Sequence, residues 1–436
     1  LTQTQSSGRP SMQESRASNM LWSSGGQFLS QVLSLGASFL LASRLPPSDF
    51  GALAIGLFGA LVCRRFIVDG VSGILVSSKD ESNEVFGAAN IIAAFIAAIF
   101  IIGMIGISFV FESFISSNAQ QSLIVLSIIP FADAVAASAN GKLIRDKKFA
   151  TITKRGLAAN FAGLLSAMAL FFAGAGFWAL VAQQIVSALA GVVFVFGTIQ
   201  RVYFLGTEMG ILTRSARAAS KIVINSAAVT LSGRIDVIVL TICYGEHYAG
   251  LYSFAKRVIE SARDAVASSL SSISLAYAKD GLSGSGHSIA RQCLQIILLI
   301  CIPASIGLMW VSKIIVNVFL PNMWGEMATY ILLLAPSLAP SVVVIVLSSF
   351  LIGAGKLRQV SLVGLAGIGS FLIVLMFAPL SVYIVPIGYT CSSGISCFLI
   401  LKNVARTDSS LLFESSWALI WGGVSSFFML PVLAGA

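Results

Sequence analysis

The sequence predicts an all-α, polytopic membrane protein, and three observations lead to that fold class. Of its 436 residues, 57% are hydrophobic and only 10% are charged, whereas an ordinary soluble domain carries about 25% charged residues. Apolar stretches of about 20 residues, the length of a membrane-spanning helix, recur through most of the chain. The polar stretches between them are short. These observations exclude secreted, cytosolic and fibrous proteins, and they leave no room for a soluble catalytic or nucleic-acid-binding domain.

Thirteen apolar segments are expected to cross the membrane as helices, because a helix satisfies its own backbone polar groups in lipid. In chain order they are residues 20–42, 50–76, 86–111, 120–141, 151–173, 176–199, 217–243, 248–277, 288–312, 326–354, 359–378, 381–401 and 415–434. The first six form an N-lobe (19–200) and the next six a C-lobe (217–402). A cytoplasmic tail (1–18) precedes them, a cytoplasmic linker (201–216) joins the lobes, and an additional transmembrane segment (403–436) follows.

The distribution of basic residues predicts the orientation. Of the 27 Lys and Arg residues, 19 fall in the N-terminal tail, in alternate connections or at the span ends that adjoin those connections, and only Arg44 and Lys313 fall on the opposite side. Positive charge concentrates in cytoplasmic loops, so the N-terminus should be cytoplasmic. The net charge of +9 is therefore assigned to orientation and not to nucleic-acid binding.

The chain also repeats itself. A shift of 199 residues places Gly51 on Gly250 and Arg64 on Arg263. The shift takes an outward span to an outward span and an inward span to an inward span, so the two halves should be parallel repeats related by an axis along the membrane normal.

Charged residues within the spans predict a central cavity. The six basic residues that remain after sorting the loops are Arg64, Arg65, Arg234, Lys256, Arg257 and Arg263. The acidic residues counted with them are Asp69, Asp236, Glu260 and Asp264. Because each such charge costs about 2.5–3.5 kcal/mol near the bilayer centre, these side chains must face protein or water.

Some of these charges are expected to neutralise neighbours on the same helix, as Lys256 and Glu260 would at i, i+4 and Glu260 and Arg263 at i, i+3. Six bases against four acids still leave a formal excess of two positive charges. An excess of this kind favours a cavity that receives an anion. Arginines suit a phosphate, whose oxygens accept the planar guanidinium in a bidentate manner.

The uncharged polar residues, the cysteines and the histidines do not predict a further functional site. Polar residues in the first span, among them Gln31 and Ser34, are interpreted as contacts between helices. The six cysteines include no C-x-x-C pair, and only two histidines are present. We therefore expect no metal site and no cofactor.

Two segments resemble a known family. Arg44 to Gly51 (RLPPSDFG), followed by a long helix with Arg64 and Asp69, resembles the L-G-P-x-D-F-G signature of Wzx-type O-antigen polysaccharide flippases. The segments 234–245 and 250–255 are similar to the seventh and eighth helices of those proteins. They belong to the multidrug/oligosaccharidyl-lipid/polysaccharide exporter superfamily. Pro46 departs from the usual glycine of the signature.

The resemblance implies two six-helix lobes around a central cavity that opens alternately inward and outward in the bacterial cytoplasmic (inner) membrane. Its substrate would be an undecaprenyl-diphosphate-linked oligosaccharide for surface polysaccharide, such as the O-antigen of lipopolysaccharide. The six basic residues would meet the diphosphate and sugars. The four carboxylates are candidates to carry a coupling H+ or Na+. A polysaccharide polymerase or assembly protein is a candidate partner, and nucleic acid is not expected.

Three other functions remain open at this point. A peptidoglycan lipid-precursor flippase would share the fold, the cavity charge and the lipid carrier. A multidrug exporter of the same superfamily would need an acidic or aromatic cavity. An integral-membrane glycan ligase or polymerase would need a large outer loop with catalytic groups, and the connections here are short, so we expect no enzyme.

Overall fold

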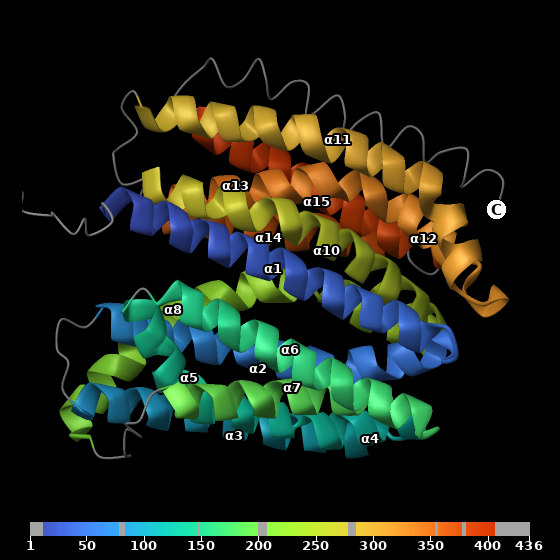
Figure 1. The fold of residues 1–436 in the computed structure, drawn as a ribbon, viewed down its shortest axis with the longest axis horizontal. Helices are drawn as coiled ribbons and strands as arrows, with labels where there is room; N and C mark the ends of the chain where they lie inside the picture. The colour runs from blue at the N-terminus through green and yellow to red at the C-terminus, as the bar shows by residue number, and fades with distance from the viewer. Residues whose placement is uncertain are drawn as a thin grey trace, which may run out of the picture.

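The computed structural model describes residues 12–77, 83–146, 148–198, 207–277, 285–353, 356–376 and 381–405. All regular structure in these ranges is helical, and Figure 1 shows the helices as two stacked groups. Within these described ranges, nine segments are long and apolar enough to cross a membrane. The predicted thirteenth span (415–434) lies outside the described residues.

The N-lobe contains six helical segments, one of which is divided. They are α1 (Met12–Ala42), α2 (Pro47–Ser77), α3 (Asn83–Val110), α4 with α5 (Ser117–Leu126 and Ile128–Arg145), α6 (Phe149–Phe172) and α7 (Phe177–Thr198). The division between α4 and α5 falls at Ser127. Pro130 explains it, because proline has no N–H to donate and its ring clashes with the carbonyl of Leu126, four residues earlier.

The C-lobe repeats this plan with two divided segments. It consists of α8 with α9 (Met209–Ser232 and Ile235–Tyr244), α10 (Glu246–Tyr277), α11 (Ser285–Phe319), α12 with α13 (Met327–Leu334 and Leu338–Gly353), α14 (Leu357–Leu375) and α15 (Ile384–Ala405). The twelve segments correspond to the first twelve predicted spans. Two starts differ from expectation, since α1 begins within the predicted tail and α8 begins within the predicted linker.

The packing of the helices shows the two-fold relation between the lobes. α1 packs on α6 of its own lobe and on α10 of the other lobe. Its counterpart α8 packs on α14 of its own lobe and on α2 of the other. α2 and α10, which are also counterparts, pack directly on each other. The all-α fold with two six-helix lobes is therefore confirmed.

The closest approach of the lobes lies at the end that carries the α1–α2 loop. A β-carbon added at Gly51 would lie 1.9 Å from the carbonyl oxygen of Glu246, and one added at Gly250 would lie 1.7 Å from that of Pro47. Both pairs obey the 199-residue shift, so this is one contact made twice about the two-fold axis. Glycine is required at both positions because any side chain would meet backbone.

Two side-chain contacts join the lobes at the same end. Both carboxylate oxygens of Glu246 accept hydrogen bonds from Ser116, from the backbone nitrogen at 2.8 Å and from the hydroxyl at 2.6 Å. The indole of Trp324 donates to the carbonyl oxygen of Leu45 at 3.2 Å. The α1–α2 end is therefore closed in this structure.

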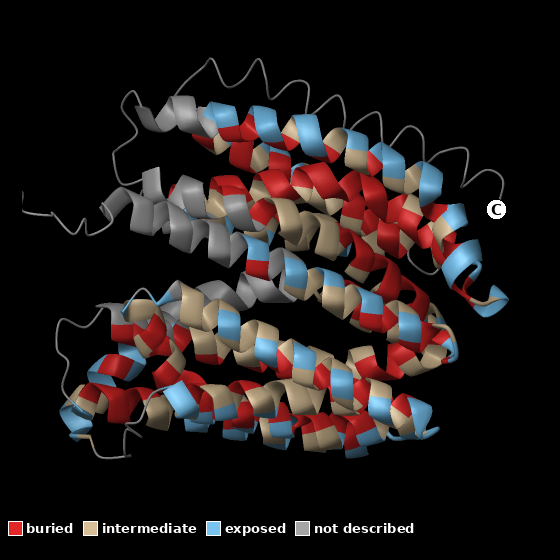
Figure 2. Cartoon of the chain, viewed as in Figure 1, coloured by how far each residue is buried: buried red, intermediate tan, exposed pale blue. Residues whose placement is uncertain are grey.

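The outer faces of the bundle are apolar. Figure 2 shows buried residues along α12 and α13 and exposed residues along the outside of α11. The exposed side chains include large apolar ones, such as Phe95 and Ile102 of α3 and Leu299 and Trp310 of α11. A surface of this kind is stable only against lipid. The chain is a multi-pass membrane protein.

Candidate functional site

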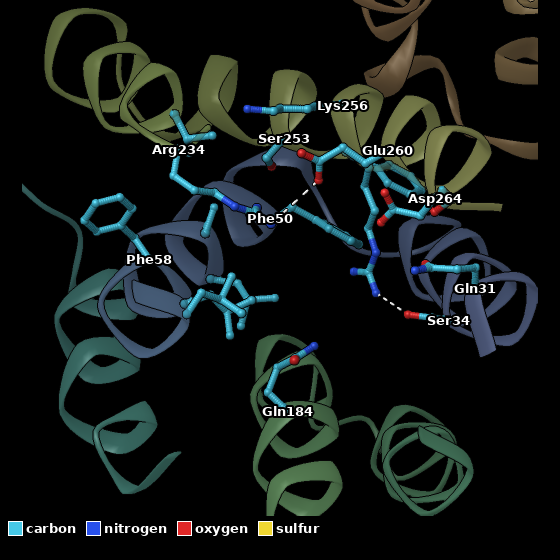
Figure 3. Close-up of a pocket in the computed structure, with 18 residues that line it drawn as sticks. Gln31, Ser34, Phe50, Phe58, Gln184, Arg234, Ser253, Lys256, Glu260 and Asp264 are labelled. Carbon is cyan, nitrogen blue, oxygen red and sulfur yellow. Dashed lines mark hydrogen bonds and ion pairs between the residues drawn. The ribbon is translucent and has the colours of Figure 1, made fainter. Parts of the chain in front are cut away.

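A cavity of about 290 Å³ lies between the two lobes, and side chains from α1, α2, α7 and α10 converge on it (Figure 3). The junction between α8 and α9 completes its wall. The cavity is lined by Gln31, Ser34, Phe50, Leu53, Ala54, Leu57, Phe58, Leu61, Gln184, Arg234, Val237, Ser253, Phe254, Lys256, Arg257, Glu260, Ser261 and Asp264.

The two lobes contribute different chemistry to the cavity. The α2 wall is an apolar strip that runs from Phe50 to Leu61, and Gln184 of α7 adds one amide beside it. All five charged side chains of the lining come from the C-lobe. One wall can therefore bind polar or ionic groups, while the other excludes water from them.

A carboxylate joins two of the C-lobe arginines. Glu260 lies between Arg234, with an N–O distance of 3.7 Å, and Arg263, at 3.6 Å. Arg263 also contacts Asp264, from its Nε to Oδ1 at 2.8 Å. The expected i, i+3 pair of Glu260 and Arg263 is present. These four residues hold two positive and two negative charges, so they are neutral as a group.

Arg257 differs from its neighbours. Its guanidinium donates to the hydroxyl of Ser34 at 2.7 Å, and within the described residues it forms no ion pair. This hydrogen bond crosses from α10 of the C-lobe to α1 of the N-lobe, and a dashed line that ends at Ser34 marks it in Figure 3. Arg257 is thus a cavity cation whose direct hydrogen-bond partner among the described residues is a neutral hydroxyl.

Lys256 lines the cavity, but its ammonium group belongs to a buried network. Its ammonium group pairs with Asp236 and donates to the carbonyl oxygen of Gly233 at 2.7 Å. The hydroxyl of Tyr252 donates to the same carboxylate. The ring of Tyr389 lies 4.3 Å from the ammonium nitrogen. The network leaves Lys256 neutralised by Asp236.

The break between α8 and α9 explains why Lys256 pairs with Asp236 and not with Glu260. The break frees the carbonyl of Gly233 from the helical ladder, and Lys256 satisfies it. Asp236 lies in the first turn of α9, where the helix dipole favours a negative charge, and it accepts the backbone N–H of Val237 at 3.0 Å. The expected i, i+4 pair of Lys256 and Glu260 is replaced by this arrangement.

The remaining predicted residues lie elsewhere. Arg64 of α2 pairs through Nε with Asp133 of α5 at 2.8 Å, within the N-lobe, and it does not line the cavity. Arg65 is exposed and is also absent from the lining. The side chain of Asp69 lies outside the part of the chain that the structure describes.

Sequence reasoning missed several of these residues. Asp133 lies inside the expected span 120–141, and the count of charges within spans overlooked it. Its inclusion reduces the formal excess from two to one for the residues counted. Ser34 was assigned to helix packing, and Gln184 was not considered. An inventory of every polar residue within the spans would have included all three.

A second, apolar hollow of about 780 Å³ adjoins the cavity. It lies between α1, α10 and α11, where residues such as Leu35, Phe39, Leu308 and Phe319 line it. Gln31 and Ser261 line both spaces, so the apolar groove borders the cavity. Within the described ranges, no group of three or more His, Cys, Asp or Glu residues is arranged to hold a metal ion.

Comparisons with known proteins agree with this architecture. The family described as "Polysaccharide biosynthesis protein" matches residues 40–329. Among solved structures, the lipid II flippase MurJ in an inward closed conformation aligns with a TM-score of 0.74 and 13% identity, covering 94% of this chain and 98% of that one. An inward-facing MATE multidrug resistance transporter of the MOP superfamily aligns with a TM-score of 0.72 and 14% identity, covering 88% and 96%. A search of curated proteins found no match.

Proposed function

We propose the following function for this chain, which belongs to the family of polysaccharide biosynthesis proteins. In this proposal the protein flips an undecaprenyl-diphosphate-linked oligosaccharide across the bacterial cytoplasmic membrane, by alternating access of a cavity between its lobes. The proposal rests on the family, on a fold shared with transporters and on the chemistry of the cavity.

One observation carries the proposal: Arg257 faces the cavity and forms no ion pair within the described residues. Burying an unpaired charge is unfavourable unless a counter-charge or water reaches it. A diphosphate supplies that counter-charge, and its oxygens match the guanidinium geometry. The neutral group formed by Arg234, Glu260, Arg263 and Asp264 can rearrange its pairs around the incoming anion.

The apolar groove provides a binding surface for the lipid tail of the proposed substrate. A lipid-linked sugar carries a polar head and a long apolar tail, which cannot enter the same environment. In the proposed pose the diphosphate lies at Arg257, the sugars occupy the wetter space beside Gln31 and Gln184, and the tail lies along α1 and α11. In this proposal the substrate spans the boundary between cavity and groove, where Gln31 and Ser261 line both spaces.

The hydrogen bond between Arg257 and Ser34 suggests how binding couples to movement of the lobes. Phosphate oxygens compete with the Ser34 hydroxyl for the same guanidinium nitrogens. Binding would therefore remove a contact that links α10 to α1. Glu260 and Asp264, which line the cavity, are the carboxylates best placed to take up a coupling H+ or Na+ when an anion draws their arginines away.

Complementation of a flippase-deficient strain tests the proposal, with surface glycan scored and membrane expression checked in parallel. Arg257→Ala should lower surface glycan by more than about tenfold, because a hydrogen bond to a charged group contributes about 1.5–3 kcal/mol. Arg257→Lys should restore it only partly, because the charge survives and the planar fork does not. Arg214→Ala, a change at an exposed arginine of α8, is the matched control and should have little effect.

Normal surface glycan from a well-expressed Arg257→Ala variant would contradict the anion-cavity mechanism. That result would favour the multidrug-exporter function, in which the cavity receives no anion. If transport depends on Arg257 but does not depend on which glycan repeat unit the lipid carries, the result would instead favour a peptidoglycan-precursor flippase.

A further inference from the structure

A second cluster of charges lies inside the N-lobe, apart from the cavity between the lobes. It consists of Arg64 of α2, Asp133 and Asn140 of α5, and Arg155 of α6. Among the described residues Asp133 accepts only the Nε of Arg64, at 2.8 Å, and the Arg64 side chain remains 43% exposed. The two terminal nitrogens of Arg64 are therefore without an ion-pair partner in the described part of the chain.

Arg155 is the least satisfied member of this cluster. It donates through Nη1 to the side-chain oxygen of Asn140, which is neutral. Its Nε is buried and has no hydrogen-bond acceptor among the described residues. The charged groups whose fields reach Arg155 are Arg64 and Asp133. Among the described residues Asp133 pairs directly with Arg64 and not with Arg155. The two arginines and this one carboxylate give the cluster a formal charge of +1.

The cluster lies between one end of the bundle and the cavity. Arg155 is six residues into α6 and Asn140 is five residues before the end of α5, so both lie about 8–9 Å from the α5–α6 connection. Asp133 lies about 18 Å from the same connection. Arg64 is one turn along α2 from Leu61, which lines the cavity. In the predicted orientation the α5–α6 connection is cytoplasmic.

We infer that Arg155 and Arg64 form a second binding site for phosphoryl groups in the N-lobe, on the cytoplasmic side of the central cavity. The Nε of Arg155 and the terminal nitrogens of Arg64 supply donors, and Asp133 holds Arg64 in place until an anion arrives. The site takes a lipid-linked diphosphate before it reaches Arg257. The identification of this natural ligand rests on the proposed function, whereas the anion site itself does not.

Asp133 gives the site a property that a purely structural ion pair would lack. Its carboxylate competes with any bound anion for Arg64 and repels that anion. Removal of the carboxylate charge should therefore strengthen anion binding. In a merely structural pair, the same change would lower stability without a gain in affinity.

The test is a binding measurement on the full-length protein in nanodiscs, with radiolabelled farnesyl diphosphate as the probe. An Arg234→Gln/Arg257→Gln background removes two cations of the central cavity, so that the N-lobe site is measured alone. Inorganic pyrophosphate and farnesol serve as competitors. Competition by pyrophosphate but not by farnesol would show that the phosphoryl group is recognised, and farnesyl diphosphate binding much more tightly than pyrophosphate would identify a lipid-linked ligand.

In this background, Arg155→Gln should weaken binding by more than about tenfold, as expected for the loss of a charge-assisted contact. Arg155→Lys should retain part of the affinity. Asp133→Asn should strengthen binding several-fold. Lys154→Gln changes the exposed neighbour of Arg155 and is the matched control, with no effect expected.

Unchanged affinity in Arg155→Gln, or weaker binding in a folded Asp133→Asn variant, would overturn the inference. If Asp133→Asn fails to fold, the comparison of Arg155→Gln with Lys154→Gln decides alone, because Arg155 forms no ion pair in the described residues. Arg257 is absent from the background used, so this outcome is independent of the complementation result for Arg257.

Discussion

The buried pair of Lys256 and Asp236 allows a prediction with a magnitude. The two side chains are only 3% and 1% exposed, and they lie between α9 and α10. Removal of one partner of a buried ion pair leaves the other charge uncompensated, at a cost of about 3–5 kcal/mol. Lys256→Met and Asp236→Asn should therefore each lower the free energy of unfolding by that amount.

The double variant should be far more stable than the sum of the two changes implies. The amide oxygen introduced by Asp236→Asn would still accept the Tyr252 hydroxyl, and no charge would remain buried. The carbonyl of Gly233 would lose its donor, which costs about 1–3 kcal/mol. The two single changes together should cost about 6–10 kcal/mol, whereas the double variant should cost about 1–3 kcal/mol. The expected coupling energy between the two positions is therefore at least about 3 kcal/mol.

Equilibrium unfolding of the detergent-solubilised protein measures this cycle, and complementation of transport should run beside it. If the pair serves stability, the double variant should regain transport that the single variants lose. A double variant whose cost equals the sum of the single costs within about 0.5 kcal/mol would show that the two side chains do not interact as described. A stable double variant without transport would instead return Asp236 to the candidates for ion coupling.

Two further predictions concern the lobes and the membrane. Gly250→Val should reduce transport while the protein still inserts, because the β-carbon of the valine would overlap the backbone of Pro47. Gly103→Val is the control and should not reduce transport, because the space around Gly103 is open. Equal transport by the two variants would contradict a required close approach of α2 and α10. In a background without native cysteines, Asp146→Cys should react with an impermeant thiol reagent only when the cytoplasmic face is accessible, and labelling of intact cells from the periplasm would reverse the orientation.

The sequence alone was sufficient for the membrane class, the spans and the repeat. Hydropathy is a sum over neighbouring residues, so twelve spans could be located without knowledge of their partners. The match of Gly51 to Gly250 by a 199-residue shift also needed only the sequence. The ends of helices were less certain, as the early start of α8 shows, because a polar turn can continue a helix beyond the apolar stretch.

The candidate site was only partly predictable. Charges within spans identified α10 and the α8–α9 segment as polar, and both supply walls of the cavity. The same reasoning assigned Arg64 to that cavity, whereas the structure gives it a partner, Asp133, within the N-lobe. The depth of a residue along a helix can be counted from the sequence, but the direction in which its side chain points cannot.

Only the tertiary structure decided which charges meet. Lys256 reaches Asp236 across two helices because the break at Gly233 brings a free carbonyl and the start of α9 to the same place. Arg257 reaches a hydroxyl of the other lobe and, in the part of the chain that the structure describes, pairs with no carboxylate. Composition and order of residues determine how many charges a membrane protein must bury. Their partners depend on the rotation and tilt of each helix, which are set by the packing of all its neighbours at once.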